Sequence, residues 1–357
     1  MRRVARAVNL VRPIRRLLAP RLDLDGRSSG GSSRQRRPAE RGATYRLRYT
    51  GRLDAASFHG RCAEFDNWYH SYYFDNGFAV RGDYDIGADI RDYGFPEDMR
   101  GMTVLDVGTG SGWFAFYFAQ HGADVTALDV RGYCDFDVYG RPEYPPISSE
   151  GRPPDRVDDE GRPIWYSPVS EGFWIMREIL ETPIQFMNAR VYDIGPELFD
   201  RKRFDLVFLG ALLLHLRDPI GALMAVHSVC RGRVVASTPV MAGEDGPGVA
   251  PRQYLPFTSI DRISWWLPNR ACFEHWFNAA GFHSVDVSRV ATLRCDVEHR
   301  TESGRLVNGD QPLRVGHALV ASDRIQGADR GSPLAGNVED AQRSAALEVE
   351  ASKGARG

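Results

Sequence analysis

Three glycines and two aspartates in one short region have the types and the spacing of a ligand-binding turn. Gly108, Gly110 and Gly112 form a G-x-G-x-G turn within "VLDVGTGSGWFAF". Glycine permits a sharp turn and lets a ligand approach the bare backbone closely. Asp106 stands at the entry of the turn, and Asp129 ends the next apolar segment, "TALDV". An acidic residue at the position of Asp129 can accept hydrogen bonds from both ribose hydroxyls of an adenosine.

The turn differs from the fingerprint that binds dinucleotides. That fingerprint, G-x-G-x-x-G, requires a third glycine where this chain has Trp113. Asp106 would repel a pyrophosphate but would attract an ammonium group. A ligand with an adenosine, a ribose and an ammonium, but no phosphate, is S-adenosylmethionine (SAM). The alternative is another nucleotide-binding α/β protein.

The whole of "LDVGTGSG…LDV" resembles the class I SAM-dependent methyltransferases. The resemblance implies an enzyme that transfers a methyl group from SAM. It implies that Asp193, at the end of the expected third strand, hydrogen-bonds the adenine amino group, although a solvated loop aspartate is the alternative. It also implies that the backbone of Gly210 and Ala211, in "FDLVFLGAL", approaches the cofactor closely.

Three further segments narrow the resemblance: "NWYHSYYFDNG", "FLGALLLHLRDPIGAL" and "RISWWLPNRACFEHWFNAAGF". They are similar to the group containing the bacterial enzyme that modifies the wobble uridine of tRNA by carboxymethyl transfer. Trp68, Tyr69 and His70 match the W-Y-H segment of that group, and we assign Trp68 and Tyr69 to cofactor binding. His215 matches the histidine that follows its fourth strand, and Arg262 matches the arginine that grips the extra carboxylate of carboxy-SAM.

Two departures from that group concern the same carboxylate. Leu214 stands where the group has a tyrosine, and no lysine lies between Trp68 and Gly101, where the carboxymethyl enzyme has one. Without these contacts the extra carboxylate would be poorly paired, and an unpaired buried charge is costly. We therefore expect SAM and methyl transfer instead of carboxy-SAM and carboxymethyl transfer.

Methyl transfer requires alignment of the reacting groups and, for an oxygen or nitrogen nucleophile, a base that titrates near neutral pH. His215 is the first candidate base and His70 the second; the alternatives are a packed histidine and a structural hydrogen bond within the aromatic segment. Trp265 and Trp266 could line the acceptor pocket through apolar area and stacking, although one of them could belong to the core. Arg262 could bind an acidic group on cofactor or substrate, or be solvated.

The elements that must position these residues alternate along the chain. We expect strands over residues 102–107, 123–130, 184–191, 203–212, 232–240, 283–290 and 313–322, and helices over 112–122, 173–181, 218–229 and 267–282. This alternation predicts a Rossmann-like, doubly wound α/β fold. We expect a mostly parallel, seven-stranded sheet with an antiparallel hairpin at one edge.

Composition divides the chain into segments. We expect a basic, disordered arm over residues 1–45, an N-terminal aromatic cap over 46–100 and a methyltransferase domain over 101–323. Within that domain we expect a lid-like insertion over 131–168, and after the domain a disordered tail over 324–357. The insertion is too long for a simple connection and is therefore either disordered or functional.

Charge and cysteine content bear on partners and compartment. Residues 1–41 hold twelve Arg and three acidic residues, a net charge of +9, so that the total of −2 leaves −11 for the remainder. The arm is interpreted as a solvated tail; the alternatives are a transit peptide, a membrane-surface helix and a nucleic-acid arm. The negative remainder favours a small-molecule or a lipid- or sugar-linked acceptor over tRNA.

No stretch is apolar enough to span a membrane. The five scattered cysteines suggest neither a metal site nor a disulfide framework, so we expect a cytoplasmic protein.

Overall fold

The structure is a computed structural model. It describes residues 44–65, 68–130, 137, 156–157, 163–164, 168–241, 250–254, 265–295 and 311–320. The predicted basic arm up to residue 43, the C-terminal tail, most of the insertion and Arg262 lie outside the described residues. Among the described residues, no helix has both the length and the apolar character needed to cross a membrane.

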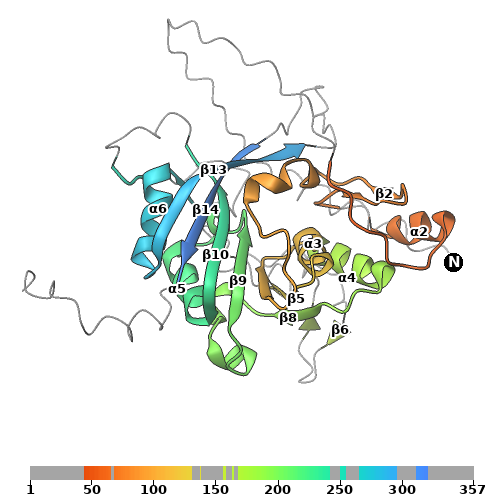
Figure 1. Ribbon diagram of the computed structural model, residues 1–357, viewed down its shortest axis with the longest axis horizontal. Coiled ribbons are helices and arrows are strands. Elements are labelled where there is room, and N and C mark those ends of the chain that lie inside the picture. The colour runs from red at the N-terminus through yellow and green to blue at the C-terminus, as the bar shows by residue number, and fades with distance from the viewer. Residues whose placement is uncertain are drawn as a thin grey trace, which may run out of the picture. The chain divides into compact units, whose positions relative to one another are not determined.

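The described residues contain one large sheet of eight strands in the order β3-β13-β14-β10-β9-β4-β5-β8 (Figure 1). The strands are β3 (Tyr84–Asp85), β4 (Thr103–Val107), β5 (Asp124–Asp129), β8 (Gln185–Asn188), β9 (Phe204–Gly210), β10 (Cys230–Pro239), β13 (His283–Cys295) and β14 (Gln311–Leu319). The five strands from β10 to β8 are parallel, and β14 is antiparallel to both β10 and β13. The chain winds outward from β4 in both directions, which confirms the predicted doubly wound sheet.

The sheet has one strand more than the seven predicted. The additional strand, β3, comes from the segment before the predicted domain and pairs antiparallel with the end of β13. An ion pair beside it, between Arg294 Nε and Asp89 Oδ2 at 2.5 Å, joins the same two parts of the chain. A strand of two residues shows no alternation of polar and apolar residues, so its sequence gives no signal.

Helices cover both faces of the sheet (Figure 1). Those of the large fold are α3 (Trp113–Gln120), α4 (Pro168–Leu180), α5 (Pro219–Val229) and α6 (Arg270–Ala279). The side chain of Asp218 accepts a hydrogen bond from the backbone N–H of Gly221 at the start of α5, and that of Asn269 does the same for Cys272 in α6. Such caps satisfy N–H groups that have no partner inside the helix.

The remaining elements are short. They are α2 (Ala55–Cys62), β1 (Tyr72–Tyr73), β2 (Ala79–Val80), β6 (Arg156–Val157), β7 (Pro163–Ile164), β11 (Gln253–Tyr254), β12 (Leu267–Pro268) and the 3-10 helices η1 (Gly87–Tyr93), η4 (Val191–Asp193), η5 (Pro196–Phe199) and η6 (Leu213–His215).

Two hydrophobic clusters lie on the two faces of the sheet. One contains Val104 of β4 with the buried side chains of α3 and α4, and the other contains Leu105 with those of α5 and α6. The alternation of neighbouring residues between the clusters is that of a strand buried on both faces.

The aromatic segment before the sheet belongs to the first cluster. Trp68, Tyr72 and Phe74 are almost fully buried, and α3 is apolar on all sides because these rings cover the side that would otherwise face solvent.

Candidate active site

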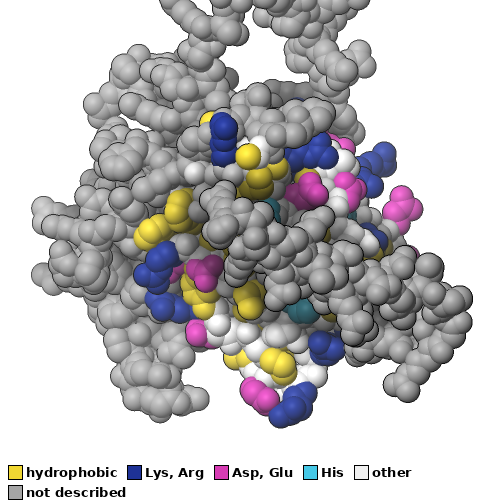
Figure 2. All heavy atoms as spheres, turned by 90° about the vertical axis from the view of Figure 1, so that its left-hand side faces the viewer, with side chains coloured by type: hydrophobic (Ala, Val, Ile, Leu, Met, Phe, Trp, Pro, Cys, Tyr) yellow, Lys and Arg dark blue, Asp and Glu magenta, His cyan; other side chains and the backbone are white. Residues whose placement is uncertain are grey.

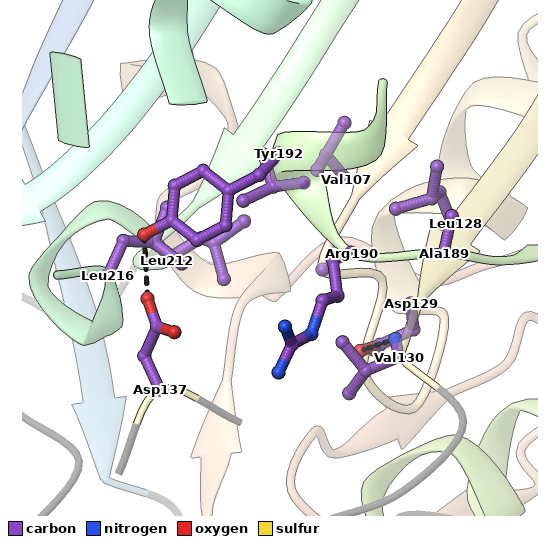
Figure 3. A pocket seen from close by; sticks show the side chains of 12 residues that line it. Val107, Leu128, Asp129, Val130, Asp137, Ala189, Arg190, Tyr192, Leu212 and Leu216 are labelled. Atoms are coloured by element: carbon purple, nitrogen blue, oxygen red, sulfur yellow. Dashed lines mark hydrogen bonds between the residues drawn. The ribbon is translucent and has the colours of Figure 1, made fainter. Parts of the chain in front are cut away.

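A pocket opens at the carboxyl ends of β4 and β5, beside the point where the strand order reverses (Figure 3). Ligands bind at this point in open α/β sheets. The pocket is lined by Val107, Gly108, Leu128, Asp129, Val130, Asp137, Ala189, Arg190, Val191, Tyr192, Leu212 and Leu216.

The glycine turn shapes one wall of this pocket. Gly108, Gly110 and Gly112 have φ values of +73°, +57° and +89°, a conformation that other residues rarely adopt. Space is limiting as well, because a Cβ atom at Gly108 would lie 3.2 Å from Leu212, and one at Gly112 would lie 2.5 Å from the Phe173 ring. The turn therefore requires glycine for both its backbone conformation and its close packing.

Asp129 joins the glycine turn to the pocket. Its Oδ2 atom accepts a hydrogen bond from the backbone N–H of Gly110 at 2.9 Å, and its Oδ1 atom accepts one from Val130 at 2.8 Å. Burial raises the pKa of the Asp129 carboxyl, and these two hydrogen bonds oppose the rise. A carboxylate has about four acceptor positions, so Asp129 retains acceptor capacity for ribose hydroxyls.

Asp106 lies behind the turn and does not line the pocket. It is 2% exposed, and the hydroxyl of Thr109 donates to its Oδ2 atom at 2.6 Å. Burial, with a smaller contribution from the charge of Asp129, raises the pKa of this carboxyl to about 7, although the hydrogen bond from Thr109 opposes the rise. Asp106 therefore titrates close to neutral pH.

Two other predicted cofactor residues lie beside the pocket and do not line it. Asp193 ends η4, where its Oδ2 atom accepts a hydrogen bond from the backbone N–H of Arg190 at 3.3 Å. Gly210 ends β9, and a Cβ atom there would lie 2.8 Å from the ring of Phe208. Ala211 follows with a φ of +47°, an unusual conformation for a residue with a side chain.

The structure brings His215 together with the two predicted acceptor-site tryptophans. His215 ends η6, whose neighbouring residues Leu212 and Leu216 line the pocket. The carbonyl oxygen of Leu214 accepts hydrogen bonds from the backbone N–H groups of Trp265 at 2.7 Å and Trp266 at 3.3 Å. The tryptophan pair is thus fixed against the element that carries His215.

His70 lies instead against the glycine turn. Its Nδ1 atom is 2.9 Å from the Ser111 hydroxyl oxygen, to which the backbone N–H of His70 also donates at 3.3 Å. The hydroxyl of Tyr72 donates to the carbonyl oxygen of Ser111 as well. Burial lowers the pKa of His70 to about 3, so its ring is neutral at physiological pH and a weak base. These observations favour the structural alternative for His70.

The other two members of the W-Y-H segment also pack in the core. The indole N–H of Trp68 donates to the carbonyl oxygen of Cys62 at 3.2 Å. The ring of Tyr69 packs against His70 and Tyr84, with centroid distances of 4.8 and 5.1 Å. None of these residues lines the described pocket.

Three polar residues of the pocket were not predicted from the sequence. Arg190 and Tyr192 follow β8, and Asp137 belongs to the long insertion. The position of Arg190 and Tyr192 directly after the third parallel strand is the signal that could have found them. Our prediction named only Asp193 from this segment. Asp137 carries no local signal, because its partners are 55 and more residues away.

A doubly wound sheet with a glycine-rich turn after β4 and an aspartate at the end of β5 defines a nucleoside-binding α/β protein. The chain belongs to the methyltransferase domain family, whose model matches residues 81–287. This match confirms the resemblance to SAM-dependent methyltransferases on which the glycine turn was interpreted.

The curated relatives include tRNA U34 carboxymethyltransferases. A tRNA U34 carboxymethyltransferase of Azotobacter vinelandii is 26% identical over 211 residues, which cover 57% of this chain and 53% of that protein. The enzyme of the same description from Pseudomonas putida gives the same identity and coverage. The chain spans about half the length of the curated relatives it matches.

Among solved structures, the N-terminal domain of EvdMO1 with SAH bound aligns at 16% identity and a TM-score of 0.47, over 75% of this chain and 98% of that chain.

Proposed function

We propose that this methyltransferase transfers the methyl group of SAM to an oxygen or nitrogen nucleophile of a small-molecule or a lipid- or sugar-linked acceptor, with His215 as the base. The observation that carries the proposal is the place of His215. It ends η6, between the pocket wall formed by Leu212 and Leu216 and the segment of Trp265 and Trp266. An acceptor bound against the tryptophans would lie next to both the base and the cofactor.

The described pocket fits the nucleoside part of SAM. Leu128, Val130 and Leu212 offer apolar surface for the adenine ring, and Asp129 offers acceptors for the ribose. Asp106 is buried behind the glycine turn, and its contact with the ammonium group of SAM stays a prediction. When bound, SAM would supply a sulfonium methyl group whose carbon the nucleophile attacks in line, while the S–CH3 bond breaks and S-adenosylhomocysteine leaves. The cofactor roles of Trp68, Tyr69, Asp193 and Gly210 stay predictions.

His215 would accept the proton that the nucleophile loses as it is methylated. It is half-buried, and its neighbours Leu212 and Leu216 line the pocket. Trp265 and Trp266 would hold the acceptor through apolar contact, since both indole N–H groups donate to backbone carbonyls of the protein. Arg262, which we assign from the resemblance to the wobble-uridine enzymes, stays a candidate for binding an acidic group on the acceptor.

The distribution of charge supports a small acceptor over RNA. Outside residues 1–41 the chain carries a net charge of −11, whereas RNA binding relies on a basic face. On the face shown in Figure 2, the Lys and Arg side chains of the described residues are interspersed with Asp and Glu.

Modification of a tRNA wobble uridine is the second candidate, and the similarity to the tRNA U34 carboxymethyltransferases favours it. Leu214 opposes the carboxymethyl version of this reaction. Its side chain is buried and lacks a hydrogen-bond donor, whereas an extra carboxylate on the cofactor would need one.

Mass spectrometry of metabolite, lipid and tRNA pools from cells with and without the gene tests the proposal. We expect a species heavier by one methyl group in the metabolite or lipid fraction only when the gene is present. The His215→Ala variant should abolish this product while still binding SAM. A product confined to tRNA, or unchanged activity of the variant, would contradict the proposal.

A further inference from the structure

Asp137 connects four parts of the chain at the edge of the cofactor pocket. Its side chain is 6% exposed, although the residue belongs to a long insertion. Its Oδ2 atom accepts hydrogen bonds from the Tyr192 hydroxyl at 2.6 Å and from the backbone N–H of Arg217 at 2.9 Å. Its backbone carbonyl accepts one from the indole N–H of Trp265 at 2.8 Å. A buried carboxylate with two donors on one oxygen forms a strong, directional contact.

Tyr192 is the partner that extends this contact into the pocket. Its ring lines the pocket with Leu212 and Leu216, and Figure 3 shows its hydroxyl directed at Asp137. The same hydroxyl accepts a hydrogen bond from the backbone N–H of Asp218 at 3.0 Å. Burial and the carboxylate of Asp137 raise the pKa of the phenol, so it stays protonated and donates.

The connected elements are those that form the walls of the pocket. Tyr192 belongs to η4 after β8, while Arg217 and Asp218 connect η6 to α5. Without the Asp137 carboxylate, the Tyr192 hydroxyl would lose its acceptor and the N–H of Arg217 its partner. The ring of Tyr192 could then leave its place in the wall, because its hydroxyl would retain only the contact with Asp218.

We propose that Asp137 and Tyr192 are positioning residues that act as one unit and hold the wall of the cofactor pocket in the shape that retains SAM. The proposal rests on the assignment of this pocket to SAM. A wall that is held in place before binding need not be ordered by the ligand, and this lowers the free-energy cost of binding. The unit therefore acts mainly on how long the cofactor stays bound.

The test measures binding of SAM and SAH to Asp137→Asn, Tyr192→Phe and the double variant, by titration calorimetry and stopped-flow fluorescence. Tyr192→Phe keeps the ring and removes only the hydroxyl. We expect each single variant to raise Kd by about tenfold, chiefly through faster dissociation. The double variant should be no weaker than the weaker single variant, because both changes weaken the same contact: Asp137→Asn replaces the charged acceptor by a neutral, weaker one, and Tyr192→Phe removes the donor.

Asp205→Asn is the matched control. Asp205 accepts hydrogen bonds from the backbone N–H of Thr103 at 2.9 Å and from Arg231 at 2.8 Å, but it is the second residue of β9, at the opposite end of the strand from the pocket. We expect it to lower stability and to leave the Kd of SAM unchanged. Unchanged dissociation in the Asp137 and Tyr192 variants, additive effects, or an equal loss of affinity in Asp205→Asn would each overturn the proposal. Failure of the wild type to bind SAM would instead overturn the assignment of the pocket.

Discussion

At the scale of single residues, Asp129 has two tasks in the pocket. It holds the glycine turn through the N–H of Gly110, and we propose that it also presents acceptors to the ribose of SAM. We expect Asp129→Ala to weaken SAM binding by at least about tenfold, because both tasks are lost. Isothermal titration measures the change.

Asp124→Ala is the control for that prediction. Asp124 begins the same strand and forms an exposed ion pair with Lys202 at 2.8 Å, so its loss should leave SAM affinity unaltered. Equal affinity of wild type and Asp129→Ala would remove Asp129 from the ribose site.

Asp106 makes stability depend on pH. The pKa of its carboxyl is about 7 in the folded protein, against an ordinary value of 3.8. Between these values the folded state binds a proton that the unfolded state releases, so stability should fall as the pH rises from about 4 to about 7. Asp106→Asn can still accept from Thr109 but cannot ionise.

Urea unfolding at pH 5 and pH 7.5 tests this prediction. We expect the wild type to lose more free energy of unfolding between the two pH values than Asp106→Asn, by an amount on the order of a few kcal/mol. The same loss in both proteins would show that Asp106 is not the group responsible.

The sequence predicts those site residues that follow strands and glycines. Asp129, Gly108 and their neighbours could be found because a buried strand, a turn and a second strand lie within 30 residues of sequence. Asp137 and Tyr192 could not, since their contact joins residues 55 positions apart and neither residue type is distinctive alone.

At the scale of elements, the alternation of strands and helices predicts the sheet because the central strands β4 and β9 are buried on both faces, and α3, α5 and α6 each begin at a glycine or a side-chain cap. The aromatic segment before the sheet was predicted to be a cap. Its rings pack against α3, and it holds Ser111 of the glycine turn through His70 and Tyr72. Sequence alone could not reveal this contact, because it joins residues about 40 positions apart and the only regular structure in the described part of the aromatic segment is the two-residue strand β1.

Ser111→Ala should therefore destabilise the protein. Its loss leaves the buried Nδ1 atom and the backbone N–H of His70 without their shared partner, which costs about 1–3 kcal/mol. Urea unfolding measures the change. Ser228→Ala is the control, because Ser228 donates within α5 to the carbonyl of Ala225, and its loss should cost less than about 0.5 kcal/mol. Equal stability of Ser111→Ala and wild type would mean that the segment does not hold the turn.

At the scale of the whole molecule, charge is divided between two regions of the chain. Residues 1–41 carry +9 and the remainder carries −11. Every residue that lines the described pocket lies at Val107 or later in the sequence. The sequence indicates that the arm and the site are separate parts, and the two regions can therefore be tested independently.

Deleting residues 1–41 should leave the Kd of SAM within about twofold of the full chain, because none of the pocket residues is removed. Any affinity for tRNA should instead fall, together with its dependence on salt, because the twelve Arg of the arm are the chain's densest source of phosphate contacts. Calorimetry with SAM and filter binding with tRNA at several salt concentrations separate the two effects. Loss of SAM binding on deletion would make the arm part of the fold. Salt-dependent tRNA binding that survives the deletion would place the RNA contacts on the folded domain and favour the tRNA-modifying alternative.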